Sequence, residues 1–433
     1  MAPSTLALMV PFLIAGSNWE GWRGAGGRGV ADESALPEEW DATKNVSWKT
    51  EIPGRGLSSP IVWGKRVFLT TAVEGEKIAG AKAAKHTLNG EDFVHPQSVG
   101  ADRSHTLFVL GLDLETGKLL WNEKVYEGRV YDDRHRGSSY ASSTSVTDGE
   151  RVYSFFGTEG VYCHDFDGKL LWKGDVGKYG TLGMGTGSSP VLHNGALLIQ
   201  RDGSGEKEAR LLALDARTGK ELWRVERDVH PSWSTPVVFR SAGRWEAVTC
   251  TTQWTLAYDP ASGKELWRGK GLESNAIHTP LVGEDLVVVS SGYPTKRVLA
   301  FRAGQIEGDQ ERLLWEYGKG TAYVVSPILL GAHVYLPSDG GTLTCLEAKT
   351  GKLIYEGKRL PAPTRCTASP VAFGERILIT ADDGITFVIQ AGAEHKVLAS
   401  NPIGEPVSAS LALSQGRILI RAERNLFCIK KAG

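Results

Sequence analysis

The sequence has no excess of either charge, since 49 Lys and Arg stand against 50 Asp and Glu in 433 residues. A protein that wraps nucleic acid needs a basic face, so we expect no nucleic-acid partner. Beyond its first residues, the chain also lacks any apolar run of the roughly 20 residues that a membrane-spanning helix requires. We therefore expect no transmembrane span in the mature chain.

Cysteine is scarce, and the five residues include no Cys-x-x-Cys pair. This absence excludes the usual zinc and dithiol redox motifs, and the odd number excludes a framework in which every cysteine is paired. Glycine and tryptophan are abundant instead, with 52 and 13 residues. Many glycines without a low-complexity run are typical of a fold with tight turns and many short strands.

The N-terminal residues 1–17 form an apolar stretch that ends in Ala15-Gly16-Ser17. This pattern resembles the apolar region and cleavage zone of a secretory signal peptide, although no Lys or Arg precedes it. We expect a leader and a periplasmic or secreted protein. The alternative is an apolar extension of a cytoplasmic protein.

One phrase recurs along the chain, built on Asp-x-x-Thr-Gly-Lys-x-x-Trp. Good copies occur at residues 112–121, 164–172, 214–223, 258–267 and 346–355. A second phrase precedes each copy and combines a small residue, Pro or its substitute, and two apolar runs around a Gly turn. Its anchor residues lie mostly about 40 to 47 positions apart, at Pro60, Thr144, Pro190, Pro236, Pro280, Pro327, Pro370 and Ser410.

Each unit has the pattern of four short antiparallel strands, for which repeats of this length are typical of a β-propeller. The repeated Asp can accept hydrogen bonds from the following N–H groups, and the Gly of the turn tolerates positive φ. The eighth unit stops after its third strand, whereas Asn45–Ile52 has a spare copy of the fourth, with Trp48 in place of Trp121. We therefore predict an all-β, eight-bladed propeller over residues 18–433, closed by the N-terminal strand pairing into the last blade. Residues 73–104 are an insertion within the first blade.

A large aromatic residue closes the fourth strand in all units but one, whose weak copy ends near Leu398, and suits the docking of one blade against the next. The predicted docking residues are Trp48, Trp121, Trp172, Trp223, Trp267, Trp315 and Tyr355. Two residues before each turn Asp, or before the position aligned with it, the sequence repeats a small apolar residue. Cys163, Cys345 and Cys428 occupy this position, which favours buried packing over reactivity.

The Asp-x-x-Thr-Gly-Lys-x-x-Trp repeat resembles the tryptophan-docking repeat of pyrroloquinoline-quinone (PQQ) propellers, over nearly the whole chain from Trp19. The resemblance implies one of two functions. Quinoprotein alcohol dehydrogenases bind PQQ and calcium at the propeller mouth, whereas BamB-like outer-membrane assembly proteins keep the propeller as a binding scaffold. The dehydrogenase site does not carry over, because the chain has no Cys-Cys pair. Glu273 and Asn275 could supply oxygen ligands, but they lack the family's surrounding motif.

The loops that lead into the inner strands form one mouth of a propeller, and there we place the candidate binding residues. They are Arg55, Tyr140, His230, Trp233, His278, Tyr323 and Arg365. Together they would make an aromatic and cationic rim able to stack a planar ligand or hold a carboxylate. His278 stands two residues before its anchor, where most units have Ser, so we expect it to line the channel. Each residue alone also fits an ordinary loop or core role.

We therefore expect an exported, BamB-like scaffold that binds a protein, peptide or small ligand through the mouth, as a monomer and without catalysis. No cofactor, metal ligand or catalytic residue is expected. The alternative is a PQQ-dependent alcohol or sugar oxidoreductase with Ca²⁺ and a degenerate cofactor site.

Overall fold

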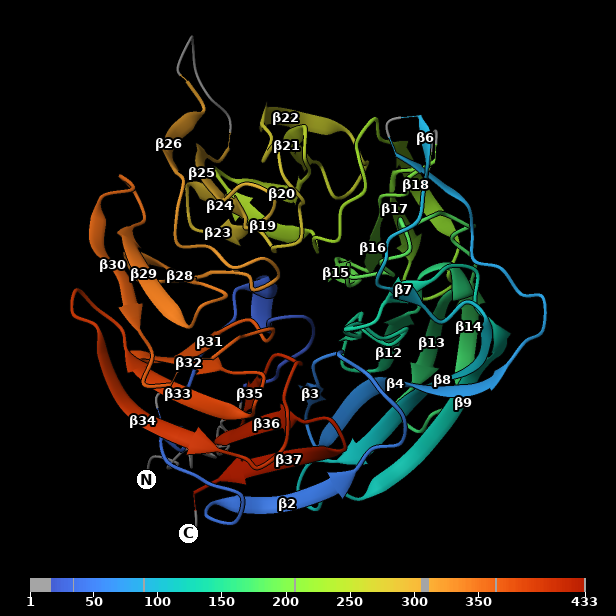
Figure 1. Ribbon diagram of the computed structural model, residues 1–433, viewed down its shortest axis with the longest axis horizontal. Helices are drawn as coiled ribbons and strands as arrows, with labels where there is room; N and C mark the ends of the chain where they lie inside the picture. Colours follow the sequence, from blue (N-terminus) through green and yellow to red (C-terminus); the bar gives the residue numbers. More distant parts are fainter. Residues whose placement is uncertain are drawn as a thin grey trace, which may run out of the picture.

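The computed structural model describes residues 17–431 except 34, 89, 206–207, 305–310 and 363. Eight antiparallel blades of four strands surround a central channel, and a parallel strand is added to the seventh (Figure 1). The predicted eight-bladed propeller is confirmed. No α-helix occurs in the described residues, which contain only the short 3₁₀ turns η1 (Ala25–Gly27) and η2 (Gly157–Glu159).

Each of the first four blades runs from the channel outward in chain order. Blade 1 contains β3 (Ile61–Trp63), β4 (Arg66–Lys77), β8 (Arg103–Asp113) and β9 (Leu119–Arg129). Blade 2 contains β11 (Val146–Thr147), β12 (Arg151–Phe155), β13 (Val161–Asp165) and β14 (Leu170–Gly174). Blade 3 contains β15 (Val191–His193), β16 (Ala196–Arg201), β17 (Arg210–Asp215) and β18 (Glu221–Glu226). Blade 4 contains β19 (Val237–Ser241), β20 (Arg244–Cys250), β21 (Trp254–Tyr258) and β22 (Glu265–Lys270).

The N-terminal region contributes a strand to each of the last two blades. Blade 5 contains β23 (Leu281–Val282), β24 (Leu286–Ser291), β25 (Arg297–Arg302) and β26 (Leu313–Tyr317). Blade 6 contains β27 (Ile328–Leu330), β28 (His333–Pro337), β29 (Thr342–Glu347) and β30 (Leu353–Arg359). Blade 7 contains β31 (Val371–Phe373), β32 (Arg376–Thr380), β33 (Ile385–Gln390), β34 (Lys396–Pro402) and, beside β31, the parallel β1 (Val30–Ala31). Blade 8 contains β35 (Ala412–Ser414), β36 (Arg417–Arg421), β37 (Asn425–Lys430) and β2 (Val46–Glu51).

Strand β2 closes the ring, as the sequence predicted. It runs antiparallel to β37 as the outermost strand of blade 8, and Trp48 lies opposite Cys428 (Figure 1). The first and last strands of the propeller thus share one sheet, which leaves no unpaired edge between the two ends of the ring.

Seven of the eight outer strands carry a docking aromatic residue, and most of these rings pack on the next blade's turn; β34 of blade 7 has none. The Trp48 indole donates to Leu114 O at 2.8 Å, and its ring lies where a Cβ on Gly117 would clash at 2.4 Å. The same N–H to carbonyl bond is made by Trp121, Trp172, Trp223 and Trp315. Trp267 instead donates to the carboxylate of Glu246, and Tyr355 packs edge-on against His395.

The small residue before each turn lies directly opposite the docking aromatic on the neighbouring strand. Gly111 faces Trp121, where a Cβ would come within 2.2 Å of the indole, and Cys163 faces Trp172. The position therefore requires a small residue, because the aromatic ring covers it. All five cysteines are buried and free, and burial raises the pKa of Cys163 to about 12, which makes it a packing residue.

The insertion extends blade 1 over its neighbours on the loop face, by which we mean the face carrying the loops that enter the inner strands. Beyond the long hairpin of β4 and β8 it forms β5 (His86–Leu88) and β6 (Glu91–Phe93), and β7 (Ser98–Val99) pairs with β10 (Arg134–His135). Figure 1 shows this segment crossing blade 2 and reaching β18 of blade 3.

The opposite face, which carries the Gly-Lys turns, is covered in part by the N-terminal segment. Trp19 bridges to Val62 on the inner strand of blade 1, and Glu20 O accepts from Thr147 N of blade 2. The segment then crosses the channel and ends at β1 on blade 7. It therefore closes one end of the channel. The expected leader lies outside the described residues, apart from Ser17.

Candidate functional site: the channel and its mouth

Along each inner strand and the loop before it, successive side chains alternate between the channel and the space between blades. This alternation determines which residues form the channel wall. A cavity of about 140 Å³ on the axis is lined by residues one and three positions before the anchor proline, such as Thr235 and Trp233. Trp22 of the N-terminal segment also lines it. The residues two positions before the proline face between blades, because successive side chains alternate.

His278 follows this rule and lies between blades, not in the channel lining. Its Nδ1 pairs with Ser290 Oγ at 2.7 Å and its Nε2 with Tyr323 O at 3.2 Å. Burial lowers the pKa of His278 to about 4, so the ring is neutral at pH 7. The structure gives His278 the place of a buried, hydrogen-bonded core histidine.

The anchor alignment differs from the structure in two blades. Thr144 and Ser410 take the position of the residue before the proline, since their hydroxyls accept backbone N–H bonds exactly where Ser189 and Ser369 do. Blades 2 and 8 have no proline at the anchor, which removed the signal that would have fixed their register.

The remaining candidate residues lie in the loops of the mouth, but not as one continuous set. Arg55 donates to the carbonyls of Arg136 and Gly137, and Trp233 donates to Gly185 O. Tyr323 packs against Tyr293, with the rings tilted by 55° and their centroids 5.0 Å apart. His230 is exposed, and Arg365 is exposed with Asp382 3.9 Å away.

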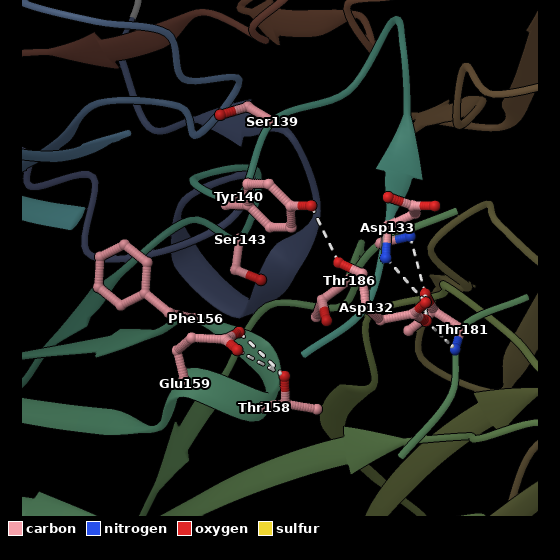
Figure 2. Close-up of a pocket in the computed structure, with 11 residues that line it drawn as sticks. Asp132, Asp133, Ser139, Tyr140, Ser143, Phe156, Thr158, Glu159, Thr181 and Thr186 are labelled. Atoms are coloured by element: carbon pink, nitrogen blue, oxygen red, sulfur yellow. Dashed lines mark hydrogen bonds between the residues drawn. The ribbon is translucent and has the colours of Figure 1, made fainter. Parts of the chain in front are cut away.

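Tyr140 is held beneath the insertion. Its hydroxyl donates to Asp132 O at 2.9 Å, the Arg134 guanidinium lies over its ring at 5.5 Å, and burial raises its pKa. Figure 2 shows it beside a water-sized cavity of about 20 Å³ that is also lined by Asp133 and Glu159. Burial raises the pKa of Glu159, whose carboxylate accepts from Thr158 Oγ1 and Tyr131 N.

A hydrogen-bond chain fastens the insertion to blades 2 and 3. His86 of β5 pairs through Nε2 with Asp132 Oδ1 at 2.9 Å and through Nδ1 with Ser204 Oγ at 3.3 Å. The other Asp132 oxygen accepts from both the backbone and the hydroxyl of Thr181 (Figure 2). The insertion is therefore a fixed part of the mouth.

This arrangement brings together basic residues that the sequence analysis did not select. His95 and His135 lie ring to ring at 5.9 Å, and the pKa of His135 is lowered by burial and then by surrounding positive charges. Those charges are His95, Arg136, Arg365 and Arg134. Together with Arg55, these residues form what we call the basic rim: Arg55, His95, Arg134, His135, Arg136 and Arg365.

The basic rim is only partly neutralised. Glu74 lies 3.5 Å from Arg134 and also pairs with Arg103, and Asp382 lies near Arg365. Neither Arg55 nor Arg136 forms an ion pair with any residue of the described chain. The run Arg134-His135-Arg136 was visible in the sequence, but only the pairing of β7 with β10 brings His95 beside it.

The residues that could supply oxygen ligands to a cofactor-bound calcium do not converge. Glu273 pairs with Arg297 at 2.6 Å, and Asn275 Nδ2 donates to Tyr323 Oη at 3.3 Å. Among the described residues, no three His, Cys, Asp or Glu side chains gather closely enough to hold a metal ion. Glu273 and Asn275, the two oxygen ligands that the sequence offered, are thus each held in another contact.

A sequence model of the family described as "Outer membrane protein assembly factor BamB" matches residues 30–206 and 207–432, nearly the whole chain. The chain belongs to this family. A search of curated protein sequences gives no match.

Solved structures agree on the fold. BamB from Moraxella catarrhalis is 12% identical with a TM-score of 0.55, over 84% of this chain and 98% of that one. The quinohemoprotein alcohol dehydrogenase from Comamonas testosteroni is 12% identical with a TM-score of 0.59, over 96% and 81%. The computationally designed Ika8 protein is 16% identical with a TM-score of 0.54, over 82% and 98%. At these identities the likeness concerns the fold, which both branches share.

Proposed function

We propose that the protein is a non-catalytic scaffold that binds an acidic segment of a protein partner at the basic rim. The observation that carries this proposal is the gathering of Arg55, Arg136 and Arg365 around the mouth, where Arg55 and Arg136 have no ion-pair partner in the described chain. A surface whose charges share one sign speeds the encounter with a partner of opposite charge and favours that partner over others. The pairing of β7 with β10 holds the backbone of Arg134 and His135, so this part of the rim needs little ordering on binding.

The comparison with BamB supports a binding role in the cell envelope, and the ligand set at Glu273 and Asn275 does not favour the quinoprotein alternative. We further propose that the protein is exported, because its apolar N-terminal residues have the pattern of a leader. In the described part of the chain, no helix has the length and apolar character to span a bilayer. Recovery from the cytoplasmic fraction with residues 1–16 retained would contradict export.

The rim is tested with two labelled peptides of equal length, one rich in Glu and one rich in Lys, by fluorescence anisotropy. We expect the Glu-rich peptide alone to bind, more weakly as salt is raised, because exposed charges are screened. The Arg136→Glu/Arg365→Glu variant should bind about tenfold more weakly, since two attractive pairs become repulsive.

The matched control is Arg240→Glu/Arg302→Glu, which reverses two exposed charges near the opposite face. It should bind the Glu-rich peptide as the wild type does. Equal binding of both peptides, or equal losses in both variants, would show that the rim is not the binding surface.

A further inference from the structure

Eight hydroxyl side chains form a ring around the channel, one from each blade. They are Ser59, Thr144, Ser189, Thr235, Thr279, Ser326, Ser369 and Ser410. In six steps around the ring, a backbone N–H donates to the next blade's hydroxyl oxygen at 2.9 to 3.0 Å, as Ser189 N does to Thr235 Oγ1. The ring thus ties neighbouring blades together.

These bonds use the hydroxyls only as acceptors. Thr279 Oγ1 likewise accepts, from the Trp22 indole at 2.7 Å. Within the described chain no ring hydroxyl donates a hydrogen bond, and Ser59 Oγ, although buried, has no partner at all. A buried hydroxyl seeks an acceptor, so the ring presents unused donors.

The cavity inside the ring contains no charged side chain. Besides ring hydroxyls its wall includes Ser142, Thr367 and Ser408, with the indoles of Trp22 and Trp233. A volume of about 140 Å³ corresponds to about four or five water molecules. It admits a small ligand, and its wall offers donors without competing carboxylates.

Two buried arginines lie behind this wall without a carboxylate partner. Arg23 is 1% exposed; it donates to Pro327 O at 2.9 Å and to Ser326 O at 3.5 Å, and its Nε has no partner. Arg421 is 3% exposed and donates to Ser58 Oγ at 2.7 Å. Neither forms an ion pair with any described residue.

The backbone makes room for both guanidinium groups. A Cβ on Gly29 would come within 2.7 Å of Arg23, and one on Gly56 within 2.2 Å of Arg421. Burial lowers the pKa of each arginine to about 9, so both remain charged at pH 7. A buried charge without a counter-charge is costly, and an anion nearby would remove much of that cost.

We propose that the channel cavity binds a small oxyanion, of the size of phosphate or a short carboxylate. The ring hydroxyls that line the cavity donate hydrogen bonds to it, and the positive potential comes from Arg23, which contacts Ser326, and from Arg421, which contacts Ser58. The proposal concerns the interior of the channel and is independent of the partner at the basic rim. Water alone would satisfy the hydroxyls but not the two charges.

The test is calorimetric titration of the whole protein with inorganic phosphate and with acetate at constant ionic strength. We expect saturable binding of one phosphate or acetate per chain. Binding should be accompanied by a rise in melting temperature and a change in the fluorescence of Trp22 and Trp233. Heat and melting temperature that depend only on ionic strength would overturn the proposal.

Two variants locate the site. Arg23→Met should bind at least about tenfold more weakly, because the anion loses an attraction across a medium of low dielectric constant. Ser189→Ala should weaken binding severalfold, whereas Ser188→Ala, which removes the adjacent hydroxyl facing between blades, should not. Unchanged affinity in both Arg23→Met and Ser189→Ala would contradict the assignment. If Arg23→Met does not fold, the serine pair decides.

Discussion

Replacement of Trp48 by Ala should destabilise the protein by about 3–5 kcal/mol, the usual cost of deleting a buried Trp side chain. The indole is 8% exposed, donates to Leu114 O and packs on Gly117 of the neighbouring blade. It also lies on the strand that joins the two ends of the ring. Its loss should therefore weaken both an interface between blades and the closure of the fold. Urea unfolding followed by circular dichroism measures the change.

The matched control is Trp254→Ala. Trp254 begins β21, is 39% exposed and stacks with Arg268 at 5.1 Å, so its removal should cost about 1 kcal/mol or less. Equal losses in the two variants would mean that β2 adds no more to stability than an exposed side chain does. A dimer of Trp48→Ala in solution would agree with an opened blade 8, because a freed edge strand pairs with another chain.

Arg227→Met should cost about 3–5 kcal/mol, because it leaves a carboxylate buried without its counter-charge. Arg227 Nη1 lies 3.0 Å from Asp202 Oδ1, with side chains 1% and 0% exposed. Arg227 also donates to Thr249 in blade 4, while Asp202 accepts from Gln200 and Ser232. The pair thus joins blades 3 and 4 beneath the loop face.

Two further measurements identify the cause of this loss. Burial raises the pKa of Asp202, and removal of Arg227 takes away the attraction that opposes this rise. The folded variant should then bind a proton more readily than the unfolded chain, so its stability should increase as the pH falls from 7 to 5. Asp202→Asn/Arg227→Met should recover part of the loss at pH 7.

The exposed pair Arg268–Glu265 provides the control, since its Nε–Oε1 distance of 2.7 Å is even shorter. Arg268→Met should cost no more than about 1 kcal/mol, because water already solvates both groups. Similar losses for Arg268→Met and Arg227→Met would contradict the role of burial.

The sequence was sufficient for the blade count because each blade repeats the same local chemistry. Asp113 accepts from Thr116 N and Oγ1, and Asp215 does the same with Thr218, as the turn motif predicted. Closure could be predicted because Trp48 repeats the pattern of Trp121. These features depend on short or repeated segments, so they can be recognised in the sequence.

The site was less predictable because it is formed by contacts between segments that lie far apart in the sequence. His278 was expected in the channel, but a shift of one residue along a strand turns the side chain to the other face. The pairing of β7 with β10 joins two segments that do not belong to the repeat. The same is true of the contacts that Trp22 and Arg23 make across the channel. The basic rim and the N-terminal segment that closes one end of the channel therefore emerged only from the three-dimensional arrangement.

Titration of the protein with PQQ and Ca²⁺, followed by an assay of dye-linked alcohol oxidation, decides between a non-catalytic propeller and an oxidoreductase. We predict no saturable cofactor binding and no turnover, because Glu273 and Asn275 are each held in another contact. Tight binding of one PQQ per chain with alcohol-dependent dye reduction would contradict the account.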